Sequence, residues 1–128
     1  LRRAVKHGDG WMGAGSSNTD SFVTAVEQTK MYLEEAGRDP DSFTISKRVY
    51  VAVDNSEDRA EGRLKKWFGK RYGNADMASA VSVWGSTAKV TEELAKITGS
   101  GAEMVLLNPA FDDMEHLDAL AEEVIPNF

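Results

Sequence analysis

The run from Phe43 to Val53 constrains the fold more than any other part of the sequence. Its side chains alternate between two faces, as in a β-strand. One face carries Phe43, Ile45, Val49, Val51 and Val53, and the other carries Thr44, Ser46, Arg48, Tyr50 and Ala52. The second half of the run is therefore apolar on both faces. That pattern is typical of a parallel strand that is covered by helices.

Short strand-like runs and amphipathic helical segments alternate along the rest of the chain. Further strands are predicted at Gly10–Gly13 and Met104–Leu107. Helices are predicted at about 19–36, 57–72, 75–80 and 86–99, with a last one whose apolar stripe is Leu117, Leu120, Ala121, Val124 and Ile125. The order βα, βαα(α), βα predicts an α/β fold of about three βα units, with parallel strands and outer helices, in a single domain over residues 1–128.

A sheet of this size leaves a problem of coverage. Strands that are apolar on both faces need cover on both, but helices on one side leave the other side exposed. We therefore expect either that the chain pairs with another copy, as a homo-oligomer, or that the rest of a barrel is absent. The opening residues favour the second reading, since Ala4-Val5 resembles the end of a helix whose beginning is missing.

The composition excludes several kinds of chemistry. The chain has no cysteine, which rules out disulfides, thiolate metal sites and cysteine nucleophiles, and a cytoplasmic location is the natural expectation. The net charge of −6 argues against general nucleic-acid binding, which needs a basic stripe. The basic cluster Arg63–Arg71 is better explained as the solvent side of a helix. No apolar run approaches the roughly 20 residues that span a membrane.

The loop after the first predicted strand is the best candidate for a binding site. It consists of the small residues Gly13, Ala14, Gly15, Ser16 and Ser17, and it leads directly into a helix. Backbone N–H groups at such a helix start can face a phosphate, and glycines permit close approach and unusual φ values. The alternative is an ordinary βα loop, in which Ser17, Asn18 or Thr19 only caps the helix.

Four segments in order resemble the bacterial luciferase-like monooxygenase family. Leu1–Met12 is similar to its "arrAar-GDGW" segment, and Glu35–Phe43 to its "eaGRDPdsf" connection. Val83–Ser86 is similar to its "v-GtPeev" helix start, although Thr87 replaces the usual proline. Ser100–Leu107 is similar to its "aGaehlvl" last strand. The resemblance implies a partial (β/α)8 TIM barrel, with these strands similar to strands six to eight and about five strands missing before Leu1.

The resemblance also implies a function. Members are flavin- or deazaflavin-dependent oxidoreductases or monooxygenases that act on small organic substrates, with FMN or 8-hydroxy-5-deazaflavin (coenzyme F-420) as cofactor. It assigns the cofactor phosphate to Gly13–Ser17. Because Ser17 or Asn18 stands where some members carry a lysine for a second phosphate, a phosphorylated sugar substrate is not expected. The reacting groups of the family lie on earlier strands, so no catalytic residue is predicted and the chain alone should be inactive.

The remaining polar residues have simpler explanations. Asn108, which follows the last strand, is predicted to line the substrate or flavin pocket. His7 and His116 are expected to be solvated surface residues, and Asp112 is expected to cap the last helix. No metal site is expected. The alternative function is a non-catalytic, truncated family member, which self-associates or binds a phosphorylated ligand.

Overall fold

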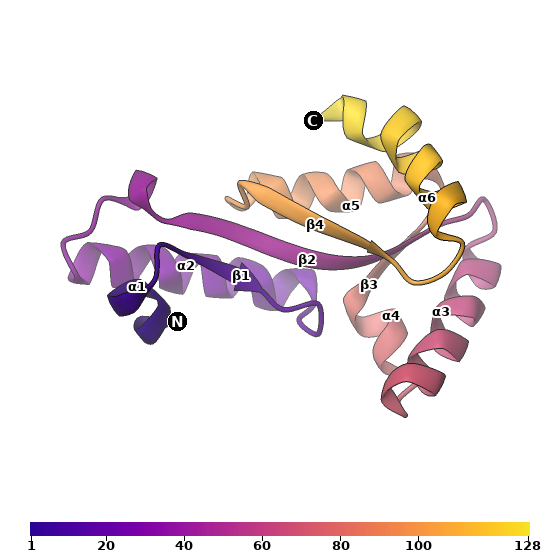
Figure 1. Ribbon diagram of the computed structural model, residues 1–128, viewed down its shortest axis with the longest axis horizontal. Coiled ribbons are helices and arrows are strands. Elements are labelled where there is room, and N and C mark those ends of the chain that lie inside the picture. The colour runs from indigo at the N-terminus through magenta and orange to yellow at the C-terminus, as the bar shows by residue number, and fades with distance from the viewer.

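A computed structural model describes all residues, 1–128, as a parallel sheet with flanking helices (Figure 1). The strands are β1 (Gly10–Gly13), β2 (Thr44–Val53), β3 (Ser82–Gly85) and β4 (Met104–Pro109). The helices are α1 (Arg2–His7), α2 (Thr19–Glu35), α3 (Glu57–Tyr72), α4 (Met77–Val81), α5 (Thr87–Gly99) and α6 (Asp113–Ala119). A 3-10 turn (Pro40–Ser42) precedes β2, and a π turn (Leu120–Val124) and a second 3-10 turn (Ile125–Asn127) follow α6.

Strand β2 is the centre of the sheet, and every other strand pairs with it in parallel. β1 pairs with residues 44–47 and β3 with residues 50–53, while β4 pairs with residues 46–51. β4 pairs with residues of β2 that also pair with β1 (46 and 47) and with β3 (50 and 51). β1 and β3 therefore lie along one edge of β2, and β4 lies along the other edge. β3 is a fourth strand where three were expected. With only four residues, it becomes a strand through its partner on β2 rather than through a local pattern.

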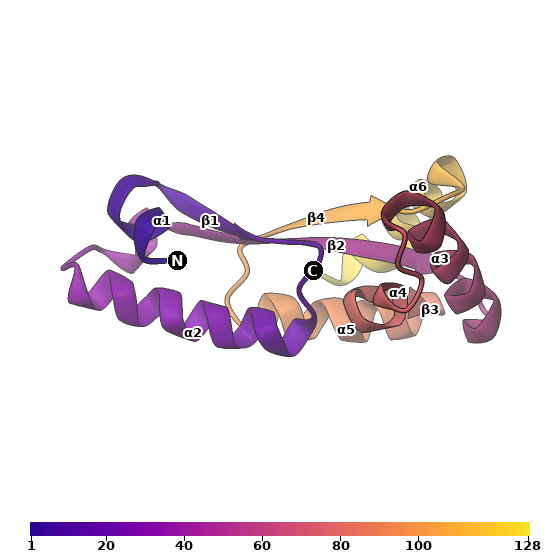
Figure 2. The same ribbon diagram turned by 90° about the horizontal axis from the view of Figure 1, so that it is seen from below.

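The main core lies between the sheet and two helices on one of its faces. Figure 2 shows α2 and α5 on the same side of β2. Phe22, Val26 and Leu33 of α2 and Val90, Leu94 and Ile97 of α5 are buried there against Ile45, Val49 and Val51 of β2. The alternation predicted for β2 is confirmed, because these odd-numbered residues face the helices and the even-numbered ones face away.

The opposite face of the sheet is covered at one end only. Tyr50 and Ala52 are buried in a second cluster with Leu64 and Phe68 of α3. Along the other half of the face no helix follows, and Met12, Met104 and Leu106 are 46%, 57% and 45% exposed. The expectation that all helices lie on one side is therefore wrong for α3, whereas the exposed apolar surface is present. The sheet does not close into a barrel.

The helix ends follow the sequence signals, with one exception. The Asn18 side chain accepts from the Ser21 N–H at 2.8 Å and caps α2, and Gly37 ends that segment at φ 63°. Asp112 stands before α6, but its side chain makes no capping bond and its φ of 49° is left-handed. The expected cap is wrong, because this carboxylate pairs with Arg63 instead.

The last helical segment differs from the prediction in its buried face. The residues that point inward are His116, Leu120 and Val124, while Leu117 and Ile125 are 54% and 51% exposed. His116 is only 5% exposed, so the expectation of a solvated histidine is wrong. The reason is the turn before α6, which sets the rotation of the helix and is not visible in its apolar spacing.

Candidate functional site

The predicted phosphate loop connects β1 to α2 through one tight turn. The Ser17 N–H donates to the Ala14 carbonyl at 3.1 Å, and the Ser17 hydroxyl donates to the same carbonyl at 2.8 Å. Ser16 is exposed, whereas Gly15 is buried. Of the two hydroxyls that the sequence offered for ligand binding, Ser17 is thus already used within the loop and Ser16 remains available.

The two glycines of the loop serve close packing rather than unusual backbone angles. Neither Gly13 nor Gly15 has a positive φ, so that part of the expectation is wrong. A Cβ on Gly13 would lie 2.6 Å from Cδ2 of Phe22 and 3.0 Å from Cδ of Lys47. A Cβ on Gly15 would lie 2.8 Å from Nε of Arg48. Each glycine makes room for a side chain of this same chain.

Lys47 holds the loop from the helix side of the sheet. Its ammonium donates to the Ala14 carbonyl at 2.5 Å, to the Ser17 carbonyl at 2.8 Å and to the Ser17 hydroxyl at 3.0 Å. Lys47 is 2% exposed and faces no carboxylate. Burial, followed by the charge of Arg48, lowers the pKa of Lys47 to about 8. This residue was not among the predicted site residues.

Arg48 stands on the other side of the loop, because successive side chains of a strand point to opposite faces. Its Nη2 donates to the Tyr50 hydroxyl at 2.8 Å, and that hydroxyl lies 2.6 Å from the Tyr72 hydroxyl. Burial and then the bond to Tyr72 raise the pKa of Tyr50. The Nε of Arg48 is buried without a hydrogen-bond partner, and Arg48 forms no ion pair.

The loop itself leaves backbone donors unused. No hydrogen bond within the chain is donated by the N–H groups of Gly15, Ser16 or Asn18. They lie at the N-terminal end of α2, a helix of 17 residues, where the helix dipole favours negative charge. Free amides between two cations without counterions form a surrounding that suits an anion.

Asn108 lies on the same face of the sheet as Arg48 and Tyr50. It is the register partner of Tyr50, from the opposite side of β2 to the loop. Its Nδ2 donates to the Pro109 carbonyl at 3.3 Å, and its side chain is half-buried. Gly15 and Asn108 thus lie beside the middle of β2, near Tyr50, at opposite edges of this strand.

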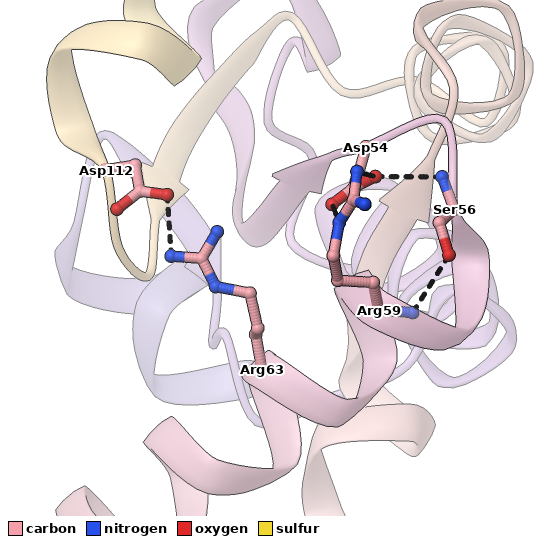
Figure 3. A network of polar contacts seen from close by, with 5 residues as sticks. All are labelled: Asp54, Ser56, Arg59, Arg63 and Asp112. Carbon is pink, nitrogen blue, oxygen red and sulfur yellow. Dashed lines mark hydrogen bonds and ion pairs between the residues drawn. The ribbon is translucent and has the colours of Figure 1, made fainter.

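A second polar cluster lies at the carboxyl end of β2, between α3 and the loop before α6 (Figure 3). Asp54 accepts from Nε of Arg59 at 2.7 Å and from the Ser56 N–H at 2.8 Å, and these bonds lower the pKa of its carboxyl. Arg63 pairs with Asp112 at 2.6 Å. The carboxylates here already have cationic partners, so the cluster ties α3 to the loop before α6.

His116 lies beside this cluster, inside the packing. Its Nδ1 is 3.1 Å from the Asp112 carbonyl, and its ring meets Phe111 edge-on. No three side chains of the types that bind metals come together anywhere in the chain. No helix is both long enough and apolar enough to cross a membrane.

The fold defines a class of protein: a parallel α/β fragment of a barrel, with a loop of small residues between β1 and α2. The sequence model of the family described as "Luciferase-like monooxygenase" matches residues 1–104. The chain therefore belongs to the luciferase-like monooxygenase family, as the four sequence segments predicted. A comparison with curated proteins gave no match.

Solved structures of similar fold extend this result. An F420-dependent secondary alcohol dehydrogenase in complex with an F420–acetone adduct is similar with a TM-score of 0.78 and 17% identity over 98% of this chain. The coenzyme F420 dependent tetrahydromethanopterin reductase from Methanopyrus kandleri is similar with a TM-score of 0.75 and 21% identity over 99%.

A third similar structure comes from a flavin enzyme. It is the oxygenating constituent of 3,6-diketocamphane monooxygenase, from a plasmid of Pseudomonas putida, in complex with FMN, with a TM-score of 0.65 and 15% identity over 99% of this chain. The chain spans 44%, 47% and 45% of these three proteins. The predicted fold, a fragment of a luciferase-like TIM barrel, is thus confirmed.

Proposed function

We propose that the chain supplies the cofactor-phosphate loop of an F420- or FMN-dependent oxidoreductase or monooxygenase that acts on a small organic substrate. The observation that carries this proposal is the charge around Gly13–Ser17. Lys47 and Arg48 flank the loop, and neither has a carboxylate partner. Two cations without counterions on either side of the loop favour an anion as its ligand.

A phosphate group fits the donors that are present. The N–H groups of Gly15, Ser16 and Asn18, the Ser16 hydroxyl and Nε of Arg48 all lack acceptors, and phosphate accepts several hydrogen bonds at once. Asn108, on the same face, is proposed to line the pocket for the substrate or the ring system. When bound, the flavin or deazaflavin would supply the redox chemistry. The residues of this chain hold and orient it.

The test compares each cofactor with its phosphate-free counterpart, and FMN and riboflavin differ in the phosphate alone. The chain is titrated with FMN and with riboflavin, and separately with coenzyme F420 and its phosphate-free deazaflavin, by fluorescence and calorimetry. We expect the phosphorylated member of each pair to bind at least about ten times more tightly, which is about 1.4 kcal/mol. Equal binding within both pairs would refute the assignment of the loop.

A second candidate function rests on the open face of the sheet. Met12, Met104 and Leu106 expose apolar surface on strands that are paired with β2. A non-catalytic member that self-associates through this face would cover it. Cofactor titration and light scattering separate the two functions. A chain that prefers the phosphorylated cofactor supports the first function, and a chain that self-associates but binds neither FMN nor coenzyme F420 supports the second.

A further inference from the structure

The strongest unexplained feature of the site is a fully buried ammonium group that touches no carboxylate. Lys47 interrupts a run of apolar residues on the helix side of β2, between Ile45 and Val49. Burying a charge costs free energy unless the charge is hydrogen-bonded. All three bonds of this ammonium go to the loop before α2. Lys47 therefore binds the loop and adds no apolar contact of its ammonium to the core.

The register of the sheet brings this about. Gly13, the last residue of β1, is the register partner of Lys47, so the loop begins directly beside the lysine. The missing Cβ of Gly13 leaves room for the lysine stem, since a Cβ there would lie 3.0 Å from its Cδ. The Nζ lies 5.8 Å from the centre of the Phe22 ring, which covers it from α2.

The bonds of Lys47 fix the direction of two peptide groups. A trans peptide directs its carbonyl and its N–H to opposite sides, and the chain has no cis peptide. The carbonyl of Ala14 points to Lys47, so the N–H of Gly15 points away from it. The carbonyl of Ser17 also points to Lys47, so the N–H of Asn18 points away as well. Neither N–H meets an acceptor in the chain.

We infer that Lys47 is the positioning residue of the anion site: it holds the carbonyls of Ala14 and Ser17 on its own side, so that the N–H groups of Gly15 and Asn18 are presented to a phosphate. This inference rests on the proposed function, which assigns the phosphate to this loop. Lys47 acts from behind the loop and does not touch the ligand. Its charge also raises the electrostatic potential at the amides.

The decisive variant is Lys47→Met, which keeps a four-atom unbranched stem but removes the ammonium and its donors. Lys66→Met is the matched control, because Lys66 is exposed on α3 and forms no ion pair. We expect FMN to bind Lys47→Met at least about ten times more weakly, with riboflavin unchanged and the control like the parent chain. Unchanged FMN affinity in Lys47→Met, in a parent chain that prefers FMN, would overturn the inference.

A rescue separates positioning from mere stability. The chain has no cysteine, so Lys47→Cys can be alkylated with bromoethylamine in the unfolded state at this site alone. The product has the length and the ammonium of lysine, and it should regain the affinity for FMN. The same residue alkylated with bromopropane has the same shape without the charge, and it should not. If the two adducts bind FMN equally, the inference is wrong.

Hydrogen exchange of the loop amides tests the role of Lys47 without any cofactor. The Ser17 N–H is protected in the turn by the Ala14 carbonyl, which Lys47 holds. Its hydrogen exchange should be at least about ten times faster in Lys47→Met, or in Lys47→Gln if the methionine variant does not fold. Unchanged exchange would overturn the inference. A parent chain that shows no preference for the phosphorylated member of either cofactor pair would refute only the proposed function, and Ser17 exchange would still decide the role of Lys47.

Discussion

Substitutions of Gly15 test separately how tightly the loop packs on β2 and whether Arg48 attracts an anion there. A Cβ at this position would lie 2.8 Å from Nε of Arg48 and 2.8 Å from Cε2 of Tyr50. Tyr50 is 2% exposed among aromatic rings and has no room to move, so Arg48 must give way and lose its bond to the Tyr50 hydroxyl. Overpacking of this kind costs about 1–3 kcal/mol, which is the destabilisation we expect for Gly15→Ala.

Gly15→Asp adds a carboxylate beside Arg48, which has no ion pair. A hydrogen bond to a charged group contributes about 1.5–3 kcal/mol, so this variant should be more stable than Gly15→Ala and close to the parent chain. The same carboxylate occupies the proposed phosphate position and repels the anion. We therefore expect a variant that folds well but binds FMN no better than riboflavin.

Urea unfolding and cofactor titration of both variants test this reasoning. Gly62→Asp is the control, because it adds the same charge at an exposed helical glycine with no atom within 4 Å. If Gly15→Ala is as stable as the parent chain, Arg48 and Tyr50 do not pack on the loop as described. If Gly15→Asp keeps the preference of the parent chain for FMN, the phosphate does not lie at this loop.

Three further outcomes are expected. The pKa of Lys47 is about 8 in the folded chain and 10.5 ordinarily, so between these pH values the unfolded chain binds more protons than the folded chain. The free energy of unfolding should therefore rise with pH in that window, by about 3 kcal/mol. Urea unfolding at several pH values checks this, and Lys47→Met should lack the rise. Asp112 has a left-handed φ of 49°, so Asp112→Gly should be more stable than Asp112→Ala by about 1 kcal/mol in thermal unfolding, both having lost the pair with Arg63. The chain should self-associate at micromolar concentration in light scattering, and Leu106→Glu should weaken this; a monomeric parent chain would contradict the reasoning about the open face.

Much of the fold follows from local patterns. The alternation of Phe43–Val53 predicts the central strand and both of its faces, and the apolar spacing of Val90, Leu94 and Ile97 predicts the buried side of α5. Gly37 marks the end of a helix because it alone tolerates the left-handed angle there at no cost. These features depend on neighbours in the sequence, so a reader of the sequence alone can find them.

The loop at Gly13–Ser17 shows where such reasoning stops. Its composition and its place between a strand and a helix identify it as a candidate anion site from the sequence. The part played by Lys47 depends on the register between β1 and β2, which joins residues 34 positions apart, 13 with 47. In the sequence alone, Lys47 only breaks the apolar pattern of the strand, and its bonds to the loop follow once the register is known.

The sequence by itself therefore determined the parallel α/β class and the family, and it marked Gly13–Ser17 as the candidate phosphate loop, since each depends on periodicity or on residues that are close along the chain. Only the tertiary structure decided that β3 joins the sheet, that α3 covers its second face and that His116 is buried. It also decided that Lys47 binds the loop from the helix side and that Arg48 lies on the other side of the loop. These features come from contacts between distant segments. Which side chains are buried, and where the charged groups lie relative to one another, depends on how the whole chain folds, whereas periodicity depends only on neighbours in the sequence.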